Sequence, residues 1–167
     1  MEPQVPFERM PTLGESVTQL LSGFTTCIEL CYTIEKNGRL GASQGAFQEL
    51  QLRLEHSAQE IQIVFDALRD YVGSLMELGD VEARNCLKES IYLMQFRVQR
   101  KLDGIASGRS DRTSHNPELP GFRDLRSLVE TVEDNVTQDL EAQAQRLQDR
   151  LARARADILA EERARTG

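Results

Sequence analysis

Tryptophan is absent from the 167-residue sequence, and aromatic residues make up only 5% of it. A core with so few rings has to be built from aliphatic side chains, which suits packed helices better than sheets, where aromatic and β-branched residues are enriched. Alternating apolar and polar runs joined by hairpin turns, the signature of strands, are also missing. The sequence therefore predicts an all-α protein.

Signals for export or membrane insertion are also lacking. The sequence has no apolar run of about 18 residues, the length that a transmembrane helix needs. It has no basic segment followed by an apolar run, as in a secretory signal. The three cysteines are an odd number without the spacing of a disulfide framework. We therefore expect an intracellular, cytoplasmic protein.

Motifs that carry chemistry are missing as well. The sequence contains no glycine-rich phosphate loop and no G-x-S-x-G nucleophile elbow. Cys27 and Cys31 would need a second pair of ligands to bind a metal ion. Neither His56 nor His115 follows a Glu by three residues, as a helical di-iron site requires. We name no catalytic, cofactor-binding or metal-binding residue, and expect both cysteines to be small buried hydrophobic residues. Enzymes are the less favoured class.

Positive charge is in short supply, since the net charge is −7. We therefore expect no nucleic-acid partner, because that binding needs a basic surface. The charge is uneven: acidic residues dominate from Ser43 to Glu82, and basic residues dominate from Arg84 to Arg112. The interpretation that we favour is two helices whose charges attract each other. The alternative is a basic patch for an acidic partner or an anionic lipid.

What the sequence does have is helical periodicity, with apolar residues every three or four positions in four segments. The first segment begins at Thr12, whose spacing from Glu15 matches a capping box, and ends at Asn37-Gly38. The second has Ser43 as its candidate N-cap and ends at Leu78-Gly79. Both are long enough to cross a bundle.

The third segment has Asp80 as its N-cap, and its apolar stripe continues to Ile105. The short connection at Gly79-Asp80 predicts that the second and third helices lie antiparallel. The fourth segment begins near Gly121 and extends to about Arg165. The predicted fold is an antiparallel bundle of about four long helices, the last of which has a coiled-coil-like extension.

The chain divides into three parts on this interpretation. Residues 1–11, which contain three prolines, are predicted to form a flexible arm, and residues 12–140 a helical bundle with a loop at 106–120. Residues 141–167 are predicted to form a projecting helical tail, because Ala, Gln, Arg and Glu replace Val and Leu there. Such a tail can pair with another chain. Leu147, Leu151 and Ile158 are its predicted interaction residues.

The first two helical segments also resemble a known group of domains. The stretch from Phe24 to Ile34 (FTTCIELCYTI), a glycine-containing break and the stretch from Phe47 to Leu54 (FQELQLRL) are similar to the N-terminal helical domains of fungal NOD-like (STAND) and HeLo-type proteins. The resemblance extends from Leu13 to Leu78. It implies a signalling or cell-death effector bundle, with membrane contact as a less favoured property.

These observations predict a non-enzymatic helical interaction or self-assembly module that presents helix faces to a protein partner or to a second copy of itself, as a homo-oligomer. Two alternatives stay open. One is a structural coiled-coil subunit of a larger complex. The other is a small helical-bundle enzyme or ligand-binding protein with a site between its helices.

Overall fold

The computed structural model describes residues 10–38, 40–108 and 121–167, and within these ranges every regular element is helical. The predicted all-α class is confirmed. Predictions that concern residues 1–9 and 109–120, which include most of the arm, most of the loop and His115, lie outside the described residues.

The first helix, α1 (Leu13–Asn37), begins and ends where its capping residues predict. The amide of Glu15 donates to the Thr12 hydroxyl at 3.2 Å, and the amide of Thr12 donates to the Glu15 carboxylate at 3.1 Å. At the other end Gly38 has a φ of 64° and donates to the carbonyl of Glu35. The capping box and the glycine stop are both confirmed.

The second predicted helix is divided in the structure. A 3-10 turn, η1 (Gly41–Ser43), leads into α2 (Gln44–Val72), and a separate short helix, α3 (Leu75–Leu78), follows. Ser43 is the N-cap residue of α2, as predicted, but its backbone is already helical and its side chain makes no capping bond. The predicted end at Leu78-Gly79 is wrong for α2. That helix stops at Gly73, whose φ of 95° is accessible almost only to glycine.

The third predicted helix is continuous but not uniform. It comprises α4 (Val81–Tyr92), a π-helical segment η2 (Leu93–Gln99) and α5 (Arg100–Ala106). Asp80 caps it as predicted, accepting from the amide of Ala83 at 2.9 Å. The wider π turn keeps Met94, Val98 and Leu102 on the buried face at steps of four.

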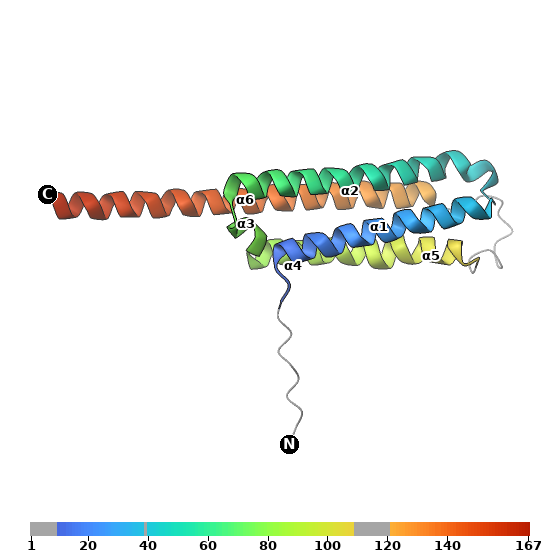
Figure 1. The fold of residues 1–167 in the computed structure, drawn as a ribbon, viewed down its shortest axis with the longest axis horizontal. Coiled ribbons are helices and arrows are strands. Elements are labelled where there is room, and N and C mark those ends of the chain that lie inside the picture. The colour runs from blue at the N-terminus through green and yellow to red at the C-terminus, as the bar shows by residue number, and fades with distance from the viewer. Residues whose placement is uncertain (1–9, 39, 109–120) are drawn as a thin grey trace, which may run out of the picture.

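The last helix, α6 (Phe122–Thr166), is the longest described element, and α2, α3, α4 and η2 pack along its first half. Helix α2 packs against α6, and α1 packs against α2, α4, η2 and α5. Figure 1 shows these helices side by side, with the second half of α6 extending beyond them. The core between them is mostly aliphatic, and the aromatic residues among its described members are Phe24, Phe47, Phe65 and Phe122. None of the described helices is both long and apolar enough to cross a membrane.

Candidate interaction surfaces

The apolar face of α6 is buried at one end of the helix and exposed at the other. The buried residues step by three and four along the first half of the helix, in the order Leu125, Val129, Val132, Val136, Leu140, Ala144 and Leu147. The same steps continue to Leu151, Ala154 and Ile158, but every residue from Asp149 onward is exposed. The side chains of Leu151 and Ile158 are 39% and 56% exposed. The tail (residues 148–167) therefore presents the continuation of the core stripe without a covering helix.

The three predicted interaction residues do not share one environment. Leu147 is buried in the core of its own chain, where it is 6% exposed. Leu151 and Ile158 lie on the exposed stripe of the tail together with Ala154. Leu159, which sequence reasoning did not single out, is 54% exposed beside Ile158. Of the predicted set, Leu151 and Ile158 are the two that a partner could reach.

The base of the tail is fixed to the start of α4 by Asp80. Besides capping α4, its carboxylate accepts from Arg146 Nε at 2.7 Å and from Arg146 Nη2 at 3.1 Å, and Arg150 lies 3.8 Å away. The Asp80 amide in turn donates to the side-chain oxygen of Gln143 at 2.8 Å. We call Asp80, Gln143, Arg146 and Arg150 the α4–α6 clamp. Sequence reasoning identified only the capping role of Asp80, because periodicity says nothing about which arginine of α6 faces it.

Electrostatics keep the Asp80 carboxylate ionised. Partial burial pushes its pKa upward, but hydrogen bonds from Arg146 and from the Ala83 amide, with the charges of Arg146 and Arg150, outweigh burial and lower the pKa. The same contact raises the pKa of Arg146. Both groups are therefore charged at neutral pH, and the clamp is an ion pair there.

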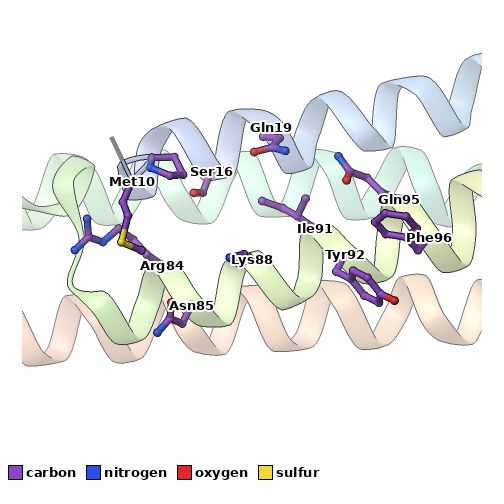
Figure 2. A pocket seen from close by; sticks show the side chains of 11 residues that line it. Met10, Ser16, Gln19, Arg84, Asn85, Lys88, Ile91, Tyr92, Gln95 and Phe96 are labelled. Atoms are coloured by element: carbon purple, nitrogen blue, oxygen red, sulfur yellow. The ribbon is translucent and has the colours of Figure 1, made fainter. Parts of the chain in front are cut away.

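A groove of about 420 Å³ lies between α1 and the α4–η2 segment, on a different side of the bundle from the α2–α6 contact. Ser16 and Gln19 of α1 line it, with Arg84, Lys88, Tyr92 and Phe96 from the facing helix (Figure 2). The rings of Tyr92 and Phe96 are in contact, with centroids 4.7 Å apart, and both are at least half exposed. The π segment begins directly after Tyr92, and such segments are common at functional sites.

The basic residues beside this groove are not neutralised by α2. The ion pairs that join α2 to another long helix go to α6: Glu49 binds Arg126, and Arg53 binds Glu130 and Glu133. Within the described ranges no ion pair joins α2 to the α4–α5 segment. The favoured interpretation of the two charged segments is therefore wrong. The cations without an ion pair on this segment are Arg84, Lys88, Arg97, Arg100 and Lys101.

Cys27 and Cys31 are buried, protonated thiols. Burial, with smaller contributions from neighbouring groups, raises the pKa of Cys27 and of Cys31 to about 12, so both thiols are protonated at neutral pH. Both are buried hydrophobic residues, as predicted, and His56 is exposed. In the parts of the chain that the structure describes, no three His, Cys, Asp or Glu side chains gather where they could hold a metal ion.

A scan against models of protein families, a search of curated proteins and a search of solved structures each returned no match.

Proposed function

We propose that the protein is a non-enzymatic helical interaction module that assembles through the tail. In this proposal α1, α2, the α4–α5 segment and the first half of α6 form a four-helix bundle in which successive helices run in opposite directions, and the tail forms a coiled coil with a partner helix. The observation that supports it is the exposed stripe of Leu151, Ala154 and Ile158, which continues the register of the buried stripe. The cytoplasmic location, and the signalling or cell-death role implied by resemblance, stay predictions.

The energetics favour a reversible assembly. Complete burial of a leucine or isoleucine side chain stabilises a complex by about 1.5–3 kcal/mol, and Leu151 and Ile158 are only partly buried in the single chain. The tail covers fewer than three heptads, which limits its affinity. However, it is a continuation of a helix anchored in the core, so the unfavourable nucleation of a helix is already overcome. We expect assembly that depends on protein concentration.

Removal of the tail is expected to convert an oligomer into a monomer. The cut should follow Arg150, because a cut after Leu140 would also remove Gln143, Arg146 and Leu147, which hold α6 to the rest of the chain. Light scattering on concentrated samples should give a dimer or larger species for the full chain and a monomer for the shortened chain. The melting temperature should change little, because residues 151–167 are exposed.

Point variants test the contribution of the apolar stripe to assembly separately from that of the rest of the tail. Leu151→Gln with Ile158→Gln should raise the dissociation constant at least about 100-fold, since two large side chains per chain lose apolar burial. Ala156→Gln with Ala160→Gln, on other faces of the same exposed helix, is the matched control and should leave the mass unchanged. A monomeric full chain, or a cut chain that still assembles, would contradict the proposal.

The groove favours a second candidate function, the binding of an acidic amphipathic helix from another protein. Lys88 and Arg84 supply charge without a paired carboxylate, and Tyr92 and Phe96 supply an exposed apolar surface next to them. Acidic partners with apolar anchors fit that combination.

A labelled synthetic helix with Glu and Leu on one face tests this second function by fluorescence anisotropy. We expect Lys88→Glu with Tyr92→Ser to weaken binding at least about 10-fold, because a charge contact and an aromatic contact are both lost. Lys36→Glu, an exposed charge reversal near the end of α1, is the control. Equal binding by both variants would show that the groove is not the site.

A further inference from the structure

We propose that the helix that covers the tail is the tail of a second copy of this chain, and that the two tails pair in antiparallel orientation. This inference rests on the proposed function and specifies its partner. It follows from two independent features, the charges that flank the exposed stripe and the position of the bundle relative to that stripe.

The buried stripe of α6 fixes the heptad positions of the tail. Steps of four and three from Leu140 place Leu147 and Ala154 at position d, and Leu151 and Ile158 at position a. The a and d residues form the seam, the line along which two paired helices meet. Once a and d are assigned, the positions g and e that flank the seam are also assigned. Arg150 and Asp157 occupy g, and Arg155 and Glu162 occupy e; all four residues are exposed.

A parallel pair of tails would bring like charges together. In parallel coiled coils a g residue faces the e residue five positions later on the other helix, and these contacts set orientation. Arg150 would then face Arg155 of the second copy, and Asp157 would face Glu162 of the second copy. Each contact occurs twice in a symmetric dimer, so all four flanking contacts would be repulsive.

An antiparallel pair of tails brings opposite charges together. In that orientation g residues face g residues and e residues face e residues, so Arg150 approaches Asp157 and Arg155 approaches Glu162. These four flanking contacts become ion pairs, while Asp157 and Arg155 also lie near their own counterparts across the twofold axis of the pair. Arg150 is available for this because its side chain is 62% exposed and its 3.8 Å contact with Asp80 is long.

The same antiparallel register uses the whole length of the tail and fills part of the seam with apolar side chains. It places Ala154 opposite Ile158 of the second copy, so that a small side chain meets a large one, and it places Leu151 opposite Glu161. Residue 148 then lies opposite residue 164, and the paired segment, about 25 Å long at 1.5 Å per residue, ends where the bundle begins. The whole tail is used, and neither tail has to enter the partner's bundle.

The position of the bundle excludes a parallel pair for a separate reason. The face of α6 that is exposed in the tail is the face that α2, α4 and η2 cover along the first half of the helix. A parallel partner on that face would carry its own bundle into the space that these helices occupy (Figure 1). An antiparallel partner carries its bundle at the far end of the tail.

The orientation is tested by a distance between spin labels on the full chain. Thr166→Cys is labelled in a Cys86→Ser background, since Cys27 and Cys31 are buried with high pKa values and stay unlabelled. Antiparallel tails separate the two labels by about 30 Å, from twenty residues of helical rise. Parallel tails would hold them near the interaxial spacing of about 10 Å. A short distance in a dimer overturns the antiparallel proposal alone, whereas a monomeric mass overturns the proposed function as well.

Two charge variants with the same net charge test whether the flanking charges cause the antiparallel orientation. Arg155→Glu with Asp157→Arg makes all four antiparallel contacts repulsive, and should raise the dissociation constant at least about 10-fold at low salt. Arg155→Glu with Glu162→Arg exchanges the charges of one pair and should leave the dissociation constant within about twofold. Parallel pairing would instead be strengthened by the first variant. Tightening by that variant, or equal weakening by both, overturns the proposal.

Discussion

Replacement of Phe47 by alanine is expected to lower the free energy of unfolding by about 4 kcal/mol. Phe47 is 1% exposed, and its ring meets the edge of Phe122 with centroids 5.3 Å apart. It lies near the start of α2, and Phe122 is the first residue of α6, so this contact joins the ends at which the chain enters the two helices. Removing the ring takes away both its burial and its aromatic partner, and leaves a cavity.

Urea unfolding followed by circular dichroism measures this loss. Leu52→Ala is the matched control, because Leu52 lies on the same helix but is 66% exposed, and it should change the free energy by less than about 0.5 kcal/mol. Similar losses for the two variants would mean that the contact between Phe47 and Phe122 does not hold α2 to α6.

Asp80→Ala is expected to lower the free energy of unfolding by about 3 kcal/mol at pH 7. Loss of the N-cap of α4 accounts for about 1 kcal/mol. Loss of the charged hydrogen bonds from Arg146 accounts for about 2 kcal/mol, because the Asp80 side chain is only 15% exposed. Asp80→Asn should cost less, since asparagine also caps helices. Glu82→Ala is the control, because Glu82 is 70% exposed and 3.6 Å from Arg146, and it should have almost no effect.

The effect of Asp80 is also expected to depend on pH. Its pKa is lowered in the folded chain, so its ionised form stabilises the fold above the ordinary aspartate pKa of about 3.9. This stabilisation is lost as the pH falls through the lowered pKa. The difference in unfolding free energy between the natural chain and Asp80→Asn should therefore be constant from about pH 6 to 8 and shrink below about pH 4. A difference that is the same at pH 3 and pH 7 would contradict the ion pair.

Local sequence signals predicted three of the helix ends at which a cap acts. Thr12 with Glu15, Gly38 and Asp80 all act as predicted, because each satisfies a backbone group through its own side chain or backbone conformation. Ser43 is the N-cap residue as predicted but makes no capping bond, because the preceding 3-10 turn already gives its backbone helical geometry, and that turn leaves no apolar pattern. Gly73 was missed because Val72 and Leu75 continue the apolar spacing across the break.

The pairing of helices could not be predicted from periodicity. The opposite charges of residues 43–82 and 84–112 indicated ion pairs that the described residues of these two segments do not make with each other, because the ion pairs of Arg53 and Glu49 are made with α6. Which helices are neighbours depends on the shapes of several apolar faces at once, whereas net charge describes each segment alone. The π segment could not be predicted from the sequence either, since Tyr92 and Phe96 have helical spacing with or without it.

The candidate site was predicted in part. The change of composition after Leu140 indicated a tail, and its stripe gave Leu151 and Ile158, which the structure exposes. It also gave Leu147, which the chain buries itself, because the clamp of Arg146 and Asp80 holds α6 in the bundle farther than composition indicates. The groove beside Tyr92 was not predicted, because it exists only once α1 lies against α4.

Helix α6 passes from the core into the tail without a break, so no swivel separates the two. A continuous helix turns by one hundred degrees or so and rises 1.5 Å for each residue, since about 3.6 residues complete a turn. Whatever binds the tail is therefore set at a definite rotational phase relative to the bundle. One residue inserted into the tail would turn a bound partner toward a different side of the bundle, whereas seven would return it almost to the original phase at about 10 Å greater distance. In such an assembly the length of the tail sets the distance between the bundle and the bound partner, and its helical rotation sets the angle between them. The direction in which the groove faces relative to the partner is fixed in the same way.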